Sequence, residues 1–334
     1  MKFIVDAYGG DFSPIELVKG AYLASKEDET LSFVLVGKEK EIIALLESFK
    51  ADMSRFEIIN ADDVFTNNDA PSTIVREREE TSLYKSLVTL KARDDIDGFL
   101  TAGSTGGTLV GSIFKVGRIK GIHRPCLMAT FPTRKEGQLV RMLDIGANMD
   151  PKPEYLYQYA LMANEFLKLT GIDNPRIGLL NVGKEEEKGN ELTHTVYKML
   201  EEDKNINFVG NIEADHVLKG EADAVICDAF SGNVFTKSLE ETAYFVSDAF
   251  QAAIKKNIFT KFGALFQLRH LKKIKGLFKY ANEAGAPLLG ISKLVIKMHG
   301  KSKADNVKAI ILESRNLVKG DLINKISQSI NKGD

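Results

Sequence analysis

The sequence predicts an α/β fold with a mostly parallel sheet covered by helices on both faces. Two observations predict it. Apolar runs of strand length alternate with amphipathic helical segments along the chain. Six short turns rich in Gly, Asn and Asp also follow directly on apolar runs, at 6–14, 101–107, 144–150, 181–190, 228–233 and 299–305. Because loops at the carboxyl ends of parallel strands share one edge of a sheet, we expect these turns to form one ligand site.

The composition suits one large α/β unit spanning residues 1–334. The chain is 44% hydrophobic and 27% charged, and its formal net charge of −1 gives no attraction to nucleic acid. Cys126 and Cys227 lie in apolar runs, and the chain opens on a strand rather than a signal peptide. No apolar run approaches the roughly 18 residues of a membrane span. These features predict a reduced, cytoplasmic setting and no nucleic-acid partner.

The N-terminal elements alternate between strand and helix. Ser13 and Pro14 predict a helix start, with Ser as the N-cap and Pro at the first helical position. Ile15, Val18 and Ala21 then share one apolar face. Strands are expected at 2–5, 31–36, 56–60 and 98–101, and further helices at 39–49, 73–90 and 108–116.

The alternation continues through the C-terminal half. The turn 134–137 predicts a hairpin between two strands. Strands are expected at 127–131, 139–144, 176–182, 206–209, 222–227 and 294–299. Helices are expected at 153–170, 190–202, 304–314 and 321–330.

One segment, 239–282, breaks this rhythm. It has no strand signal and no proline, which predicts a protruding hairpin of two long helices that turns near 260–263. Its second half interleaves Phe and Leu with Lys and Arg. Three interpretations stay open: a dimer interface or core helix pair, contact with anionic lipid by a basic amphipathic surface, or docking of an acidic protein.

The turn 181–190 combines the donors that an anion needs. Asn181 and Gly183 end a strand, and Lys188 and Asn190 open a helix whose N-terminus carries partial positive charge. The alternative is a charged surface loop, because three consecutive glutamates at 185–187 are solvated.

The turn 228–233 offers a similar set of groups. Asp228, Ser231, Gly232 and Asn233 precede Lys237, which lies one helical turn further on and can reach back to an anion. In the alternative interpretation Ser231 or Asn233 caps the helix and Lys237 is solvated.

Two further turns are candidates for contact with substrate. Gly103, Ser104, Thr105 and Gly106 predict a nest of N–H groups for an oxyanion, although Gly/Ser turns are common. Aspartates flank two glycines in the first turn: the set is Asp6, Gly9, Gly10 and Asp11. Such aspartates hold a metal or, more often, accept bonds from nearby backbone N–H groups.

His299 is the best placed of five histidines, at the end of a strand and before a glycine. It is a candidate general acid or base, although a lone histidine is more often structural. The sequence has no dinucleotide-binding glycine motif, no P-loop, no nucleophile elbow and no zinc-type spacing. We therefore expect no cofactor and no metal, and direct transfer rather than a covalent enzyme intermediate.

Taken together, the turns resemble those of the bacterial phosphate acyltransferase family of phospholipid synthesis. The matching motifs run in order along the whole chain. They are 6–11 with Pro14, 102–106, 117–121 with 124–125, 143–148, 179–183, 188–192, 209–213, 231–234, 285–290 and 299–300. Asp144, Gly146 and Asn148 are site candidates through this resemblance.

The resemblance implies transfer of a fatty acyl group from acyl carrier protein to inorganic phosphate. The acyl phosphate product then feeds a membrane glycerol-3-phosphate acyltransferase. It also implies a three-layer α/β/α sandwich of the isocitrate/isopropylmalate dehydrogenase type, a homodimer, and peripheral membrane association through the hairpin.

The sequence and the resemblance together give a catalytic hypothesis. Phosphate lies between the 181–190 turn and the 231–233 turn with Lys237, and attacks the thioester carbonyl directly. Backbone N–H groups of 104–106 stabilise the oxyanion. Lys188, His299, Ser104 and Thr105 are the catalytic candidates, with His299 or a lysine protonating the leaving thiolate.

Three alternatives remain. One is a metal- and NAD-dependent 2-hydroxy-acid dehydrogenase on the same fold, and another is a short-chain phosphate acyltransferase that uses coenzyme A. The third is a catalytically inactive membrane-associated scaffold, which is suggested by Ala229 and Ala284 at positions where the family has glycine.

Overall fold

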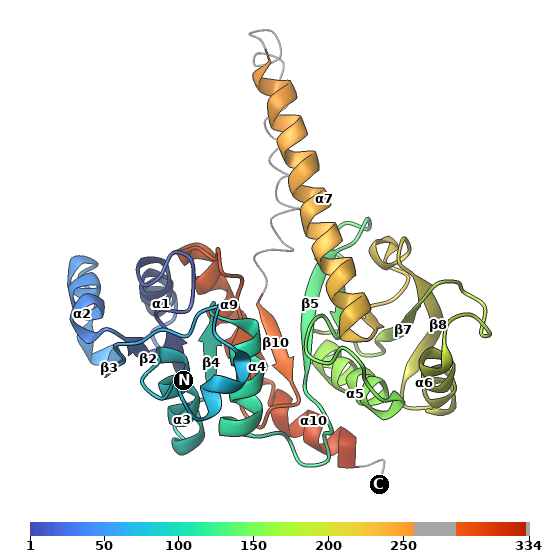
Figure 1. Cartoon of the computed structure of the whole chain (residues 1–334), viewed down its shortest axis with the longest axis horizontal. Coiled ribbons are helices and arrows are strands. Elements are labelled where there is room, and N and C mark those ends of the chain that lie inside the picture. Colours follow the sequence, from blue (N-terminus) through green and yellow to red (C-terminus); the bar gives the residue numbers. More distant parts are fainter. Residues whose placement is uncertain (257–284, 332–334) are drawn as a thin grey trace.

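A computed structural model describes residues 1–256 and 285–331. Two groups of elements lie side by side, and the long helix α7 projects from between them (Figure 1). The first group comprises β1 (Lys2–Asp6), α1 (Ile15–Glu27), β2 (Ser32–Gly37), α2 (Glu39–Ser48), β3 (Phe56–Asn60), α3 (Ser82–Ala92), β4 (Gly98–Thr101) and α4 (Thr105–Gly111). The second comprises β5 (Cys126–Pro132), β6 (Leu139–Leu143), α5 (Pro153–Leu169), β7 (Arg176–Asn181), α6 (Glu191–Glu202), β8 (Asn207–Glu213), β9 (Ala224–Ile226) and α7 (Ala229–Lys255). The C-terminal segment adds β10 (Ala286–Leu289), β11 (Leu294–Lys297), α9 (Ala304–Lys319) and α10 (Leu322–Asn331).

The strands of the described chain form one sheet in the order β3-β2-β1-β4-β11-β10-β5-β6-β9-β7-β8. Most neighbouring strands are parallel, and helices cover both faces, so the predicted α/β class is confirmed. Alternating side chains define the two faces: Phe3 and Val5 pack in one buried cluster with α1 and α9, and Ile4 and Phe99 pack in another with α3. The isocitrate/isopropylmalate dehydrogenase-like topology and the single-unit organisation stay predictions.

The expectation of one common carboxyl edge is wrong in one respect, because the sheet contains two parallel groups of opposite direction. β1 to β4 and β11 run one way, and β6 to β9 run the other way. Antiparallel β10 and β5 join the groups, and β10 pairs first with the end of β11 and then with the start of β5. The start of β5 also lies beside the end of β6. The carboxyl ends of β11 and β6 therefore both lie next to the antiparallel pair of β10 and β5.

Several expected element bounds need correction. The helix expected over 73–90 divides into a 3-10 helix, Pro71–Val75, and α3, which begins only at Ser82. Between them the Arg78 guanidinium binds Asp63 and Asp69 and holds the chain in a loop. The helix after Pro14 begins at Ile15, and the Ser13 hydroxyl donates to Gly10 O instead of capping the helix. The helix expected over 108–116 begins at Thr105, because Ser104 is its N-cap.

The segment expected to form a protruding hairpin contributes one helix to the described chain. That helix, α7, starts ten residues before 239, at the Asp228 cap, and continues without a break to Lys255. From Glu241 onward nearly all of its residues are exposed or only partly buried, so this part projects from the body of the protein. The expected turn at 260–263 and the second helix lie outside the described residues. Strand β10 was not expected, because Pro287 obscures its pattern.

Candidate functional site

The first component of the site is a row of polar side chains at the ends of β1, β4 and β11. Thr101 pairs in register with Lys297, and its hydroxyl donates to Asp6 Oδ2 over 2.8 Å. Asp6 also accepts the N–H of Tyr8 at 3.2 Å, and burial raises the pKa of its carboxyl group. Asp6 therefore holds the turn in place through hydrogen bonds, and its carboxylate is buried away from any substrate.

Close backbone packing joins the turns after β1 and β4. A Cβ on Gly9 would lie 2.8 Å from the backbone N of Gly103, so the two turns approach each other as only glycine allows. Gly10 packs on Ala102, and the N–H of Asp11 donates to Gly300 O at 2.8 Å. These contacts fix the position of the loop that carries His299.

The loop after β6 is built on one buried carboxylate, Asp144. It accepts backbone N–H bonds from Leu127, Gly146, Ala147 and Asn148 at 2.8–3.1 Å, and one from the Asn148 amide at 3.0 Å. Asn148 also donates to Pro125 O. Asp144 and Asn148 thus order the loop, and Ile145 and Gly146 are its residues that face the cleft described below.

The turn before α7 packs against this loop. Asp228 caps the helix by accepting the N–H and the hydroxyl of Ser231, both at 2.8 Å. A Cβ on Gly232 would lie 1.9 Å from Asp144 O, and the Asn233 amide donates to Ile145 O at 3.1 Å. Asp228 and Ser231 therefore follow the capping interpretation, whereas the Asn233 amide oxygen and its second N–H form no hydrogen bond within residues 1–256 and 285–331.

A cleft of about 300 Å³ lies where these components meet. Residues from both groups of strands, from β10 and from α7 line it. They are Thr105, Gly106, Leu127, Ala129, Thr130, Phe131, Ile145, Gly146, Asn233, Thr236, Lys237, Glu240, Gly285, Ala286, Lys297, Met298 and His299. With two lysines against one glutamate, the charged lining of the cleft favours an anion.

Two neighbouring residues of α7 face this cleft. The Thr236 hydroxyl is buried and has no hydrogen-bond partner within the described residues. Lys237 is exposed and pairs with Glu240 at 2.8 Å. A buried hydroxyl without a partner is costly in a folded protein, so a ligand oxygen would satisfy it.

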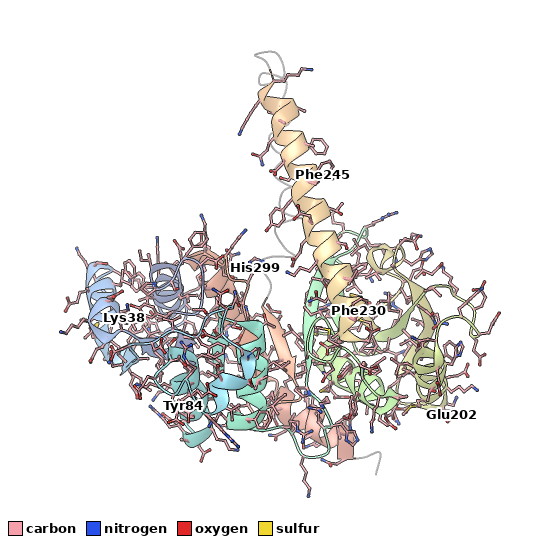
Figure 2. All side chains as sticks on the ribbon, in the orientation of Figure 1. Lys38, Tyr84, Glu202, Phe230, Phe245 and His299 are labelled. Carbon is pink, nitrogen blue, oxygen red and sulfur yellow. The ribbon has the colours of Figure 1, made fainter. Side chains whose placement is uncertain are left out.

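His299 is half-buried at the edge of the cleft, near the base of α7 (Figure 2). Burial lowers the pKa of His299 below its ordinary value of 6.5, and the positive charges of Lys237, Lys297 and Lys301 lower it further. The carboxylate of Glu240 acts in the opposite direction. Its Nδ1 accepts the N–H of Lys301 at 3.1 Å. The neutral ring therefore carries its proton on Nε2 and acts as a hydrogen-bond donor.

Lys297 was missed among the sequence candidates. It lies two residues before His299, and β11 ends there with its side chain level with Thr101. The signal was a lysine inside an otherwise apolar strand, Leu-Val-Ile-Lys-Met, where a solvated lysine is not expected.

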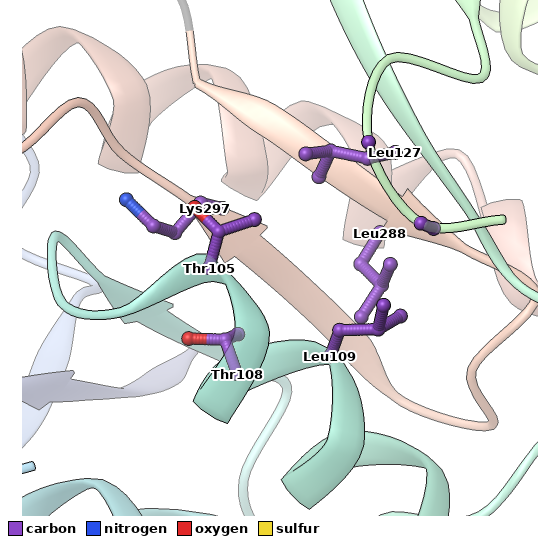
Figure 3. A pocket seen from close by; sticks show the side chains of 8 residues that line it. Thr105, Thr108, Leu109, Leu127, Leu288 and Lys297 are labelled. Carbon is purple, nitrogen blue, oxygen red and sulfur yellow. The ribbon is translucent and has the colours of Figure 1, made fainter. Parts of the chain in front are cut away.

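An apolar recess opens behind Lys297. Its lining joins Thr105, Thr108, Gly146 and Ala147 to the side chains of Leu109, Leu127 and Leu288. In Figure 3 the Lys297 amino group and the leucines lie toward opposite ends of this lining, with Thr105 beside the lysine stem. The polar cleft thus adjoins a small recess of about 10 Å³, which is mostly apolar and has Thr105, Thr108 and Lys297 on its polar side.

The turn after β7 does not line the cleft. Asn181 donates to Lys188 O at 2.9 Å, and Asn190 caps α6 by accepting the N–H of Thr193 at 3.0 Å. Gly183 packs on the Lys188 side chain, which is exposed and forms no ion pair in the described chain. Because Leu179 pairs with Ile226 in parallel register, this turn and the turn at Asp228 end neighbouring strands at the same edge.

Other reactive groups lie elsewhere. In the described residues one group, Glu213, Asp215 and His216, is close enough to hold a metal ion, and none of its members lines the cleft. Burial raises the pKa of Cys126 and Cys227 well above that of an ordinary thiol, so neither is a ready nucleophile. Within residues 1–256 and 285–331, no helix is long and apolar enough to cross a membrane.

Comparison with known proteins agrees with the sequence motifs. A family model described as fatty acid synthesis protein matches residues 1–325. The phosphate acyltransferase of Thermoanaerobacterium thermosaccharolyticum is 40% identical over 331 residues, which covers 99% of this chain and 97% of the relative. That of Halothermothrix orenii is 38% identical over 334 residues, covering 99% of each. A phosphotransacetylase structure from Streptococcus pyogenes has a similar fold, with a TM-score of 0.61, 16% identity, and coverage of 99% and 94%.

Proposed function

The chain belongs to the fatty acid synthesis protein family, and we propose that it transfers a fatty acyl group from acyl carrier protein to inorganic phosphate. The product is an acyl phosphate. The observation that carries this proposal is the cleft in which a cationic, hydroxyl-lined space adjoins an apolar recess. Such a cleft suits a reaction between a phosphate anion and a fatty acyl thioester.

The phosphate is proposed to lie beside the first turn of α7. Lys237 supplies charge there, Asn233 an amide, and Thr236 a buried hydroxyl that has no partner among the described residues. The turn 181–190 is proposed to close over the phosphate from the neighbouring strand end and to bring the Lys188 ammonium group to the anion. Phosphate held by fixed donors is ordered for attack on a carbonyl carbon.

The acyl group is proposed to approach from the opposite side. The carbons next to the thioester carbonyl are proposed to lie at the mouth of the recess against Leu109, Leu127 and Leu288, and these side chains move apart to admit them because the recess measures only about 10 Å³. The carbonyl oxygen then lies near Thr105 and Gly106, whose N–H groups begin a helix and have no acceptor in the preceding turn. These N–H groups and the His299 Nε2–H stabilise negative charge on the carbonyl oxygen during attack.

The wider role rests on the same proposal. The acyl phosphate is an activated acyl donor, which we propose is consumed by a membrane glycerol-3-phosphate acyltransferase in phosphatidic acid synthesis. The projecting part of α7 exposes Phe245 and Phe250, and Figure 2 shows Phe245 far from the body of the protein. This exposure supports a homodimer or peripheral contact of a cytoplasmic protein with a membrane surface.

The deciding experiment measures thiol release from long-chain acyl carrier protein with and without inorganic phosphate. Hydroxylamine traps any acyl phosphate as the hydroxamate. We expect phosphate-dependent thiol release and a trappable product in equal amounts. Folded protein that releases no thiol at any phosphate concentration would overturn the proposal.

Two controls address the alternative functions. Incubation with NAD, a divalent cation and 2-hydroxy acids tests the dehydrogenase, which would give a change in nucleotide absorbance. Replacing acyl carrier protein by short-chain acyl-coenzyme A tests the nearest acyltransferase alternative. Vesicle binding without any turnover would favour the scaffold.

A further inference from the structure

Lys297 occupies an unusual position for a lysine. It is partly buried at the end of β11, between Thr101 on β4 and Ala286 on β10, and it lines both the cleft and the apolar recess. Its Nζ donates to the backbone carbonyl of Met298 and forms no ion pair in the described part of the chain. Its amine is therefore a cation at the junction of the two spaces without a carboxylate that neutralises it.

The surroundings of Lys297 hold its pKa well below that of an exposed lysine. Burial and the nearby Lys237 lower the pKa to about 8, while Asp6 and Asp11 act in the opposite direction. The other titratable groups facing the cleft are His299 and Glu240. An amine with this pKa exchanges protons readily near neutral pH, whereas an ordinary lysine with a pKa of about 10.4 does not.

The proposed transfer needs a proton at the sulfur. A thiolate whose conjugate acid has an ordinary pKa of about 8.5 is more basic than phosphate, so a tetrahedral adduct returns phosphate unless the sulfur is protonated as it leaves. His299 is not suited to supply this proton, since it is neutral and would become an imidazolate by donating one. Lys297 is the remaining acid at the junction, because Lys237 is exposed and paired with Glu240.

We propose that Lys297 is the acid that protonates the departing thiolate, an inference that rests on the proposed function. A phosphate oxygen forms a bond to the carbonyl carbon as the carbon–sulfur bond breaks. The sulfur keeps the bonding electron pair and takes a proton from Lys297 Nζ. Hydrogen phosphate loses its own proton when it becomes the acyl phosphate dianion, and the neutral amine takes that proton back. The cycle is balanced, with no net proton uptake.

The test compares two palmitoyl thioesters with different leaving groups. One is palmitoyl-acyl carrier protein, and the other is the palmitoyl thioester of 4-nitrothiophenol, whose acidic thiol leaves without protonation. In Lys297→Met, and in Lys297→Arg, whose guanidinium stays protonated, we expect kcat with the carrier thioester to fall at least 100-fold. With the nitrothiophenyl thioester, the loss should stay within a few-fold.

A second measurement, the pH dependence of the rate, needs no substitution of Lys297 and starts with unmodified protein. The rate with the carrier thioester should fall as pH rises through about 8, because the acid form of Lys297 is lost. The nitrothiophenyl thioester should lack this alkaline limb. Asp6→Asn should move the limb to lower pH, because it removes a charge that favours the ammonium form.

The possible failures are distinguishable. Equal losses on both thioesters, or identical alkaline limbs, would overturn the role of Lys297 while leaving the proposed function intact. If the unmodified protein makes no acyl phosphate from either thioester, the proposed function fails, and this inference fails with it.

Discussion

Gly232 packs so closely on Asp144 that a Cβ at position 232 would lie 1.9 Å from the Asp144 carbonyl oxygen. The same Cβ would lie 2.9 Å from Cys227 Sγ. Backbone atoms cannot move aside cheaply, so this contact fixes the start of α7 against the loop that follows β6. Asn233, Thr236 and Lys237 reach the cleft because α7 begins at this point.

The first prediction concerns this contact. Gly232→Ala should lower the free energy of unfolding by about 2 kcal/mol or more, because the methyl group forces α7 away from Asp144. The same displacement should remove most phosphate-dependent thiol release. Denaturant unfolding and the acyl transfer assay measure the two effects.

Gly146→Ala is the matched control. Among the described residues, a Cβ there would meet only the Asn233 amide, at an ordinary distance of 3.5 Å, so stability should change little. If both variants unfold at the same denaturant concentration as the unmodified protein, the contact at Gly232 does not constrain the site.

The second prediction concerns charge in the cleft. Lys237→Ala should raise the KM for phosphate about tenfold or more, because it removes a cation and leaves Glu240 without its partner. Glu240→Gln should have the opposite effect and lower the KM, since it removes the one acidic side chain from the described lining. Changes of the same sign in both variants would contradict an anion subsite here.

The third prediction concerns the turn after β7. Lys188→Ala should raise the phosphate requirement or abolish turnover, because the proposed closure of this turn delivers its ammonium group to the anion. Lys184→Ala is the control, since Lys184 lies on the same turn and pairs with Glu221 at 3.4 Å. Unchanged kinetics in Lys188→Ala would remove this turn from the site.

The fourth prediction concerns the protonation state of His299. The neutral ring donates through Nε2, so His299→Gln should keep part of the activity and His299→Ala should keep less. As pH falls through the pKa of His299, which lies below 6.5, Nδ1 takes up a proton and can no longer accept the N–H of Lys301. The ring then loses the bond that orients its Nε2–H, so the rate should fall. The ratio of unmodified to Gln-variant rates cancels the titration of phosphate itself. A ratio that is constant between pH 5 and 8 would contradict this role.

The sequence predicts most of this fold because its strands are buried and its turns are distinctive. Asp228 and Asn190 stand at helix starts, and the glycines mark close approaches that the structure also contains. The reversal of direction between the two strand groups was not predictable, because it depends on which strands β10 pairs with. Local sequence carries no information about that pairing.

The candidate site was predictable to a similar extent. Thr105, Gly106, Gly146, Asn233, Lys237 and His299 come together in the cleft. Asp6, Asp144 and Asp228 instead hold backbone N–H groups, because a short carboxylate at a strand end finds local donors before it finds a ligand. Lys297 was not predicted, because its neighbours in sequence are apolar. It lies at the cleft because β11 pairs with β10 between the two groups of strands.

The fifth prediction concerns the projecting part of α7. Phe245 and Phe250 are 72% and 53% exposed, so they offer apolar surface that a lipid surface or another protein can cover. We expect the unmodified protein to sediment with vesicles that contain anionic lipid. The double variant Phe245→Ser with Phe250→Ser should bind at least tenfold more weakly, because each Phe buries enough apolar surface for about 1.5–3 kcal/mol. Phe114→Ser, at a position that is 68% exposed on the body of the protein, is the control. Light scattering on the same samples separates the alternatives. A double variant that becomes monomeric while the unmodified protein is dimeric would identify this part of α7 as the dimer interface and contradict the lipid contact.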